Sequence, residues 1–427
     1  MLFNANKGTI TMYAHHNGVN DLKFKKTITI ITVITLTLLT LSGCTTFDNF
    51  KKAFIDKPQD NDVTIAIGVY EPMSGSDKAG AAAEVEGIEL AHEMYPTVQG
   101  KIVELIYADN SSDIEAAETA INTLISREPT VILGSYSDVL SLSACEAIEK
   151  AKIPTIAITN TNPLITKDYD YYCRVCYVDS NQGDLLAQYV LNDRKQKQAG
   201  VLAPAGDDAA QAEATAFTDR MRAETGDDDA ITFYEYFHAG DKDFTKQLTK
   251  AKKKGVKQII ITGEIADAAN IINQAAAMGL DIQFLGDSKW GTEDFTSLLN
   301  ENVTPDMMAF VQFFASDGDT ATATVSKEKE TFLKAYKEKH GNQRAEPEDA
   351  VALGYDAYSM ALDVISKAPK DATSEDIIKM LTGPQYQFEG ASGLINFSSI
   401  GDPIKTAYIS TWENGSITTL YTIEPVE

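Results

Sequence analysis

The chain has 427 residues, of which 44% are hydrophobic, so it is long enough to form about two domains with apolar cores. It carries 62 acidic residues against 37 basic ones, which gives a formal net charge of −25. A surface this acidic repels phosphate backbones and anionic lipid headgroups. The composition therefore argues against nucleic acid as a partner and against membrane attachment through a basic patch.

The N-terminal residues have the order of a secretory signal peptide. Lys23, Lys25 and Lys26 precede an apolar and threonine-rich run at residues 27–39, which is shorter than the roughly 20 residues that a membrane-spanning helix needs. The segment ends in Leu-Ser-Gly-Cys, which resembles the lipobox of bacterial lipoproteins. We therefore expect cleavage before Cys44 and a lipid on that cysteine.

On this interpretation residues 1–43 are a lipoprotein signal peptide, and residues 44–62 are a polar tether that holds the folded body off the membrane. The leader contains four basic residues and one acidic residue, so the remaining 384 residues carry a formal charge of −28. The sequence leaves open whether translation starts at Met1 or at Met12.

Three further cysteines, Cys145, Cys173 and Cys176, belong to the mature chain. The last two have CxxC spacing, but the run at residues 168–179 is typical of a strand, in which residues three apart point to opposite faces. No second CxxC and no His pair completes a zinc site. We interpret the three as packing residues, expect no metal and no cofactor, and leave their pairing open, since export permits a disulfide.

After the tether, short apolar runs alternate with helical patterns. Runs that read as strands occupy residues 63–69, 101–109, 131–134, 153–159, 198–204, 231–238, 256–263, 281–287 and 307–316. Strands of this length separated by helices predict βαβ units and parallel sheets. Two such blocks predict an α/β protein with two doubly wound lobes.

The last third of the chain does not read as another domain. Helical patterns span residues 325–340, 349–367 and 374–381, and extended pairs follow. The turn at residues 413–416 contains Asn-Gly, a strong hairpin signal. This block most economically completes the two lobes already begun.

Five segments carry a resemblance to a known family. They are IAIGVYEPMSG (65–75), EVEGIELAHEMYP (84–96), the run from VILGSYSD to NPLIT (131–166), FLGDSKW (284–290) and FEGASGLINFSSIGDP (388–403). In this order they resemble extracellular solute-binding proteins of the branched-chain amino acid (Leu/Ile/Val-binding) type, which serve ABC importers. The resemblance runs from about Val63 to the C-terminus.

The resemblance implies the type I periplasmic-binding-protein fold, in which two α/β lobes are joined by three hinge crossings. We place the crossings near residues 176–181, 311–316 and 391–397. The first lobe then comprises residues 63–178 and 314–392, and the second comprises residues 179–313 and 393–427.

In open α/β sheets, ligands bind beyond the carboxyl ends of the strands, where helix N-termini present free N–H groups. In the family, small hydroxyl residues and backbone amides at two such ends hold the ligand carboxylate. Matching along residues 134–163 puts Ser137, Asp138, Thr159 and Thr161 in that cradle. Helix capping is the alternative role for these residue types.

In the second lobe, Ala209 stands where the family often has an aromatic wall, and Glu264 is expected at the pocket mouth. Asp287 lies near the family's acidic ligand for an amino group. Trp290 is either a stacking surface or a buried core residue. At the first crossing, Asp179 and Gln182 either contact the ligand or only tie the lobes together.

Asp138 departs from the family pattern, because most relatives have serine or another small residue there. A carboxylate beside a bound carboxylate costs about 1 kcal/mol at solvent-like screening and more in a drier site. Either Asp138 caps its helix, or the ligand presents an amide, an amine or a hydroxyl at that point.

The sequence as a whole predicts a lipid-anchored extracytoplasmic protein that captures a small polar solute, an amino acid or an amino-acid-like amide, and delivers it to an ABC permease and its ATPase. The alternative is a sensor of the same fold that signals to a membrane partner. An enzyme is disfavoured, because the chain lacks a GxSxG elbow, an HExxH helix and a Walker loop. The acidic runs at residues 226–230 and 315–320 are interpreted as solvated loops.

Overall fold

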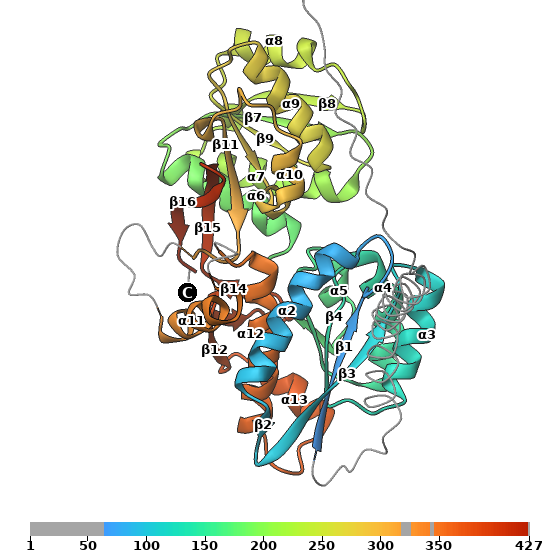
Figure 1. The fold of residues 1–427 in the computed structure, drawn as a ribbon. Helices are drawn as coiled ribbons and strands as arrows, with labels where there is room; N and C mark the ends of the chain where they lie inside the picture. The colour runs from blue at the N-terminus through green and yellow to red at the C-terminus, as the bar shows by residue number, and fades with distance from the viewer. Residues whose placement is uncertain (1–63, 317–325, 342–345, 426–427) are drawn as a thin grey trace, which may run out of the picture. The chain divides into compact units, whose positions relative to one another are not determined.

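The computed structural model describes residues 64–316, 326–341 and 346–425. The predicted signal peptide, the tether and the lipidation site Cys44 lie outside the described residues. Two large sheets and one small sheet are formed, with helices packed against the large ones (Figure 1).

The first sheet has six strands in the order β2-β3-β1-β4-β5-β6. The strands are β1 (Thr64–Glu71), β2 (Thr97–Val98), β3 (Lys101–Asp109), β4 (Val131–Gly134), β5 (Thr155–Ala157) and β6 (Tyr172–Arg174). All neighbours are parallel except β2 and β3. β4 and β5 are buried throughout, as expected for central strands covered on both faces, whereas β3 carries Lys101, Glu104 and Asp109 and is partly exposed.

Helices cover both faces of this sheet. The helices are α2 (Lys78–Met94), α3 (Ile114–Ile125), α4 (Asp138–Ala151) and α12 (Asp349–Lys367). Figure 1 shows α2 and α12 on one side of β1 and β4, and α3 and α4 on the other. Alternate residues of β1 enter the two cores, with Ile67 and Val69 on the side of α2 and α12, and Ala66 and Tyr70 on the side of α3 and α4.

The second sheet has seven strands in the order β16-β15-β11-β10-β9-β7-β8. They are β7 (Ala199–Pro204), β8 (Ile231–Phe237), β9 (Gln258–Ile261), β10 (Gln283–Gly286), β11 (Met308–Gln312), β15 (Ala407–Glu413) and β16 (Ser416–Ile423). The last two strands are antiparallel additions at one edge.

This sheet is also covered on both faces. The helices are α6 (Asp179–Asn192), α7 (Asp208–Thr225), α8 (Thr245–Lys254) and α9 (Ile265–Ala277). Leu186 and Phe217 of α6 and α7 pack with Val201, whereas Leu248 and Ile272 of α8 and α9 pack in a separate core. The α/β fold with two doubly wound sheets is thus confirmed.

The remaining elements are short or lie near the first sheet. They are α5 (Leu164–Lys167), α10 (Glu293–Ser297), α11 (Lys327–His340), α13 (Ser374–Leu381), β12 (Gln387–Gly390), β13 (Gly393–Phe397) and β14 (Pro403–Lys405). The sequence analysis assigned residues 393–427 to the second lobe; of these, β13 pairs with β12 and β14 pairs with β13 in a separate three-stranded sheet. The buried Lys405 holds them there, because its Nζ donates to Ser392 and to the Val175 carbonyl. After β14, the chain returns to the seven-stranded sheet with β15, which begins at Ala407.

All three described cysteines are buried and free, which agrees with the packing interpretation. Strand β6 ends at Arg174, so Cys176 lies beyond it, and its Sγ donates to the Asn160 carbonyl. In the described part of the chain, no group of His, Cys, Asp and Glu side chains is arranged to hold a metal ion. Over the same residues, no helix combines the length and the apolar character needed to cross a membrane.

Candidate functional site

The carboxyl ends of β1, β4 and β5 lie side by side at one edge of the first sheet, because Tyr70 pairs with Gly134 and Leu133 pairs with Ile156. The loop after β4 leads into α4, with Ser137 as its N-cap and Asp138 as its first residue. Thr159 and Thr161 lie in the loop after β5. The four residues predicted for the lobe 1 cradle therefore come from two neighbouring strand ends.

Helix capping does not account for the first two of these residues. The side chain of Ser137 accepts no hydrogen bond from the first turn of α4. The Asp138 carboxylate reaches the neighbouring loop instead, where its Oδ1 lies 3.4 Å from the Asn162 amide nitrogen, which donates to it. Burial raises the pKa of Asp138 above its usual range, although Asn162 and Arg174 oppose the shift.

A pair of buried carboxyl groups underlies this edge, and the sequence analysis missed it. Glu71, at the end of β1, and Glu84, in α2, are both fully buried and in contact. The Tyr136 amide donates to Glu71 Oε2 at 2.8 Å, and the Thr159 hydroxyl donates to Glu84. Burial raises the pKa of Glu71 well above its usual range and that of Glu84 to about 7, so the pair retains a proton near neutrality.

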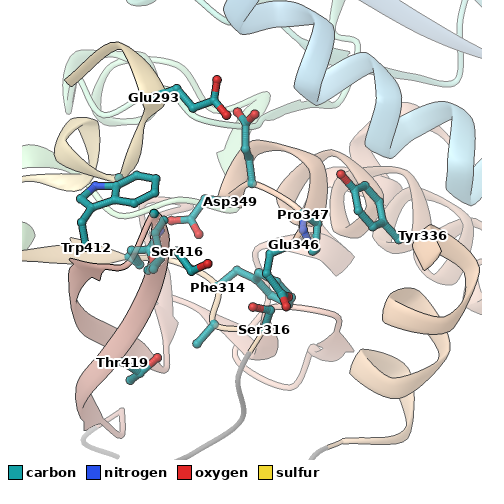
Figure 2. Close-up of a pocket in the computed structure, with 16 residues that line it drawn as sticks. Glu293, Phe314, Ser316, Tyr336, Glu346, Pro347, Asp349, Trp412, Ser416 and Thr419 are labelled. Atoms are coloured by element: carbon teal, nitrogen blue, oxygen red, sulfur yellow. The ribbon is translucent and has the colours of Figure 1, made fainter. Parts of the chain in front are cut away.

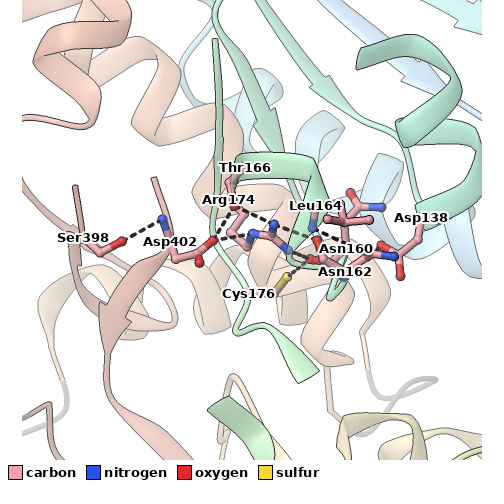
Figure 3. A network of polar contacts seen from close by, with 9 residues as sticks. All are labelled: Asp138, Asn160, Asn162, Leu164, Thr166, Arg174, Cys176, Ser398 and Asp402. Carbon is pink, nitrogen blue, oxygen red and sulfur yellow. Dashed lines mark hydrogen bonds and ion pairs between the residues drawn. The ribbon is translucent and has the colours of Figure 1, made fainter. Parts of the chain in front are cut away.

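A buried arginine fixes the loop after β5. Arg174 Nη1 donates to the Asn160 carbonyl at 2.7 Å, and Nη2 donates to the Asn162 carbonyl at 2.8 Å (Figure 3). Its Nε lies 2.8 Å from Asp402, and Thr166 bridges the two side chains. The guanidinium thus ties the cradle loop to the three-stranded sheet, and its charge is compensated by Asp402.

The second lobe contributes a polar group at the end of β10. Asp287 follows this strand and accepts from the Lys289 amide at 3.1 Å, while Lys289 Nζ lies 3.4 Å from its other oxygen. Gln182, in α6, is fully buried, and its Oε1 accepts from the Ser288 amide at 2.8 Å. Gln182 therefore braces the turn that carries Asp287.

The polar groups of the two lobes meet at the start of α6. The Asp179 amide donates to the Thr161 carbonyl at 3.1 Å. Burial raises the pKa of Asp179 to about 6, while Lys289 opposes the shift and Asp287 and Asp138 add to it. Asp179 therefore lies near Asp138, Asp287 and Lys289, and its amide ties the start of α6 to the loop after β5. We take these four residues as the candidate cleft.

Glu213 was also missed by the sequence analysis. It lies in α7, is 3% exposed, and burial raises its pKa well above the usual range, with Asp287 and Asp179 adding to the shift. It shares the buried face of α7 with Ala210, Ala214 and Phe217, as Glu84 shares that of α2 with Ala81 and Ile88. A carboxylate on the apolar stripe of a helix was the available signal.

Three predicted residues lie outside this cleft cluster. Trp290 is 1% exposed, and its ring stacks on that of Phe295 with centroids 4.8 Å apart. It is therefore a buried core residue and not a stacking surface for the ligand. Ala209 and Glu264 are exposed near the starts of α7 and α9. Within the described residues, no hydrogen bond or ion pair joins the Glu264 side chain to the cluster, and Ala209 lies one helical turn before Glu213 in α7.

A pocket of about 250 Å³ lies elsewhere, between the chain segment after β11 and the β15–β16 hairpin (Figure 2). Phe314, Asp349 and Trp412 line it, and the Phe313 amide donates to Asp349 at 2.7 Å. None of the strand-end residues described above lines this pocket. We therefore assign the candidate site to the strand-end cleft, which offers carboxylates, hydroxyls and amides for a small polar solute.

The chain is similar to solute-binding proteins of known structure. A leucine-binding protein (LivK) from Thermotoga maritima is 30% identical, with a TM-score of 0.69 over 84% of this chain and 99% of that one. A branched-chain amino acid transporter substrate-binding protein (LivJ) from Streptococcus pneumoniae, in complex with isoleucine, is 28% identical, with a TM-score of 0.68 over 85% and 100%.

A leucine-, isoleucine-, valine-, threonine- and alanine-binding protein of Pseudomonas aeruginosa is 25% identical over 79% of this chain and 87% of its own length. The family model described as periplasmic binding protein matches residues 64–416. That match spans the first sheet, the second sheet up to the start of β16, and the cleft residues. The chain therefore belongs to the periplasmic binding proteins, a family with a solute-binding role outside the cytoplasm.

Proposed function

We propose that this protein captures a small polar solute, an amino acid or an amino-acid-like amide, between its two lobes and delivers it to an ABC importer. The observation that carries the proposal is the position of Asp179 at the start of α6, where its amide donates to the Thr161 carbonyl after β5 of the first sheet and its carboxyl group lies near Asp287 after β10 of the second. Ligands of open α/β sheets bind at such carboxyl ends. Closure of the two lobes on the solute would then form contacts that only the closed state makes.

The relatives support the amino acid class. The protein of Pseudomonas aeruginosa is named for five amino acids, and that of Streptococcus pneumoniae was solved with isoleucine. We extend this chemistry to the present chain as part of the proposal. The family is one of binding proteins, and we propose that the protein has no catalytic activity of its own.

We further propose that Cys44 is lipidated and anchors the protein outside the cytoplasmic membrane, close to its permease. The support is the basic, apolar and Leu-Ser-Gly-Cys order of the leader. Mass spectrometry of the N-terminus of the protein isolated from membranes should find a diacylglyceryl group on Cys44. An unmodified Cys44, or a chain that starts elsewhere, would overturn the anchor and leave solute binding untouched.

Binding is tested by isothermal titration with leucine, isoleucine, valine and a wider panel of amino acids and their amides. At least one should bind, and Thr161→Ala and Asp287→Asn should each weaken it about tenfold, the loss of one or two polar contacts. The matched controls are Thr119→Ala, on the exposed face of α3, and Asp281→Asn, on the surface. Both should bind the solute as the unaltered protein does.

Circular dichroism should show that the four variants are folded. Unchanged affinity in both cleft variants would mean that the cleft is misplaced. Absence of binding for the whole panel would contradict the proposed function. If the protein binds a solute but does not support uptake of that solute in cells that carry an ABC permease, a sensor function would be favoured instead.

A further inference from the structure

The cleft carries more negative than positive charge. Asp138 comes from the first lobe, and Asp179, Glu213 and Asp287 come from the second. Lys289 is the cation that acts on all four, and its side chain is about half exposed beside Asp287. Arg174 also acts on Asp138, but Arg174 is already paired with Asp402. The ammonium group of Lys289 is therefore shared by four carboxyl groups.

The buried Glu213 Oε1 is inaccessible to water and accepts no hydrogen bond from a described residue. A buried acceptor without a donor costs free energy, which a bound N–H group would recover. The Glu213 side chain is 3% exposed, so bulk water does not serve it.

The pKa values of the carboxyl groups are also consistent with a ligand that donates N–H groups. Burial raises the pKa values of Asp138, Asp179 and Glu213, and the neighbouring carboxylates add to the shift for the last two. Glu213 therefore favours its protonated form, and the carboxyl groups of Asp138, Asp179 and Asp287 share the ammonium group of Lys289. A ligand carboxylate at Asp138 would add like charge, whereas a ligand ammonium would remove the imbalance.

We propose that the solute is a small cationic amine without a free carboxylate, the class that includes amino-acid amides and diamines, with its ammonium group held between Asp138 and the Asp179–Glu213 side of the cleft. This inference rests on the proposed function and narrows its substrate class. The Asp138 carboxylate then selects for positive charge.

The test compares each amino acid with its own amide, because the two differ only in the carboxyl group. Isothermal titration with leucine and leucinamide, isoleucine and isoleucinamide, alanine and alaninamide, and with 1,5-diaminopentane should find amides or the diamine bound at least tenfold tighter than any free amino acid. The preference should shrink at high salt, because it is electrostatic.

Two variants with opposite expected signs support the comparison. Asp138→Asn should weaken the amide and strengthen the amino acid, whereas Lys289→Gln should strengthen the amide, because it removes the competing ammonium. Asp281→Asn changes the net charge by the same amount at a 90% exposed site and should leave the ratio unaltered. If Asp138→Asn does not fold, Lys289→Gln still tests the proposal by itself.

A free amino acid that binds as tightly as its amide or tighter would overturn this inference and leave the proposed function standing. An amide preference that survives Asp138→Asn and does not rise in Lys289→Gln would also overturn it. Absence of binding for every amino acid, amide and diamine would instead contradict the proposed function itself.

Discussion

At the scale of single residues, the unusual feature is the number of carboxyl groups taken out of water. Glu71, Glu84 and Glu213 are nearly or fully buried without a lysine or arginine in direct contact among the described residues. Removing an unpaired charge from water is costly, so such groups hold protons instead. Those protons link the stability of the fold to pH.

The free energy of unfolding should decrease as the pH rises from about 4.5 to about 7. Burial raises the pKa of Glu84 from 4.5 to about 7 in the folded state, so the folded protein binds more protons than the unfolded chain within this window. Glu71, Asp138 and Tyr136 face Glu84, and none of them supplies a positive charge. Glu84→Gln should flatten the pH profile, with a gain on the order of a few kcal/mol above pH 7.

Urea denaturation of both proteins between pH 4.5 and 8 measures this effect. Some slope should remain in the variant, because burial also raises the pKa of Asp349 to about 7. Glu118→Gln, on the exposed face of α3, is the matched control and should keep the full slope. A variant profile as steep as that of the unaltered protein would show that Glu84 is already ionised in the fold.

The residue scale also shows where sequence-based prediction fails. Glu84 and Glu213 lie on helix faces that otherwise bury small and apolar residues, and a pattern that assigns charged residues to solvent passes over them. Trp290 had two open roles, and only the packing of Phe295 against its ring distinguishes them. Ser137, Asp138, Thr159 and Thr161 lie at two neighbouring strand ends, as local pattern and the family resemblance predict, and their role in ligand binding stays a prediction.

At the scale of elements, local signals predicted the structure well. The helices expected at residues 349–367 and 374–381 are α12 and α13 with the same bounds. The Asn-Gly turn joins β15 to β16, with φ of 53° at Asn414 and 80° at Gly415, the left-handed values that such a turn requires. Periodicity and turn chemistry depend on residues close together in the chain, so they can be predicted from a single sequence. The β12–β13 hairpin is local too, but the hydrogen bond from Lys405 to the Val175 carbonyl joins residues 230 apart, and one sequence does not show it.

The contact between α2 and α12 gives a prediction for this scale. A methyl group on Gly87 would lie 2.0 Å from the Val351 carbonyl oxygen, and one on Gly354 would lie 2.2 Å from that of Glu84. Helix propensity alone favours Gly87→Ala by about 1 kcal/mol, but the clash with a rigid backbone should dominate. We expect Gly87→Ala to lower the free energy of unfolding by about 1–3 kcal/mol.

Chemical denaturation checks the sign of this change. Ala82→Gly, at an exposed position of the same helix, is the comparison and should cost only the propensity, about 1 kcal/mol. A stabilised Gly87→Ala protein would mean that the two helices do not approach each other as closely as described.

At the scale of the whole molecule, function depends on the two large sheets and the segments that connect them. The chain passes from β6 to α6 near Asp179, and from β11 towards α11 and α12 beyond Gln312. It enters the seven-stranded sheet again at Ala407. Connections of this kind allow hinge motion, in which a ligand stabilises the closed state through contacts to both lobes.

Small-angle X-ray scattering with and without a saturating ligand tests whether the two lobes close on the solute. The ligand is the amino acid, amide or diamine that binds most tightly in the titrations, and Asp287→Asn at the same ligand concentration is the comparison. We expect a smaller radius of gyration for the liganded protein and a weaker change for the variant. Superimposable scattering curves for the free and fully liganded protein would contradict capture by closure of two lobes.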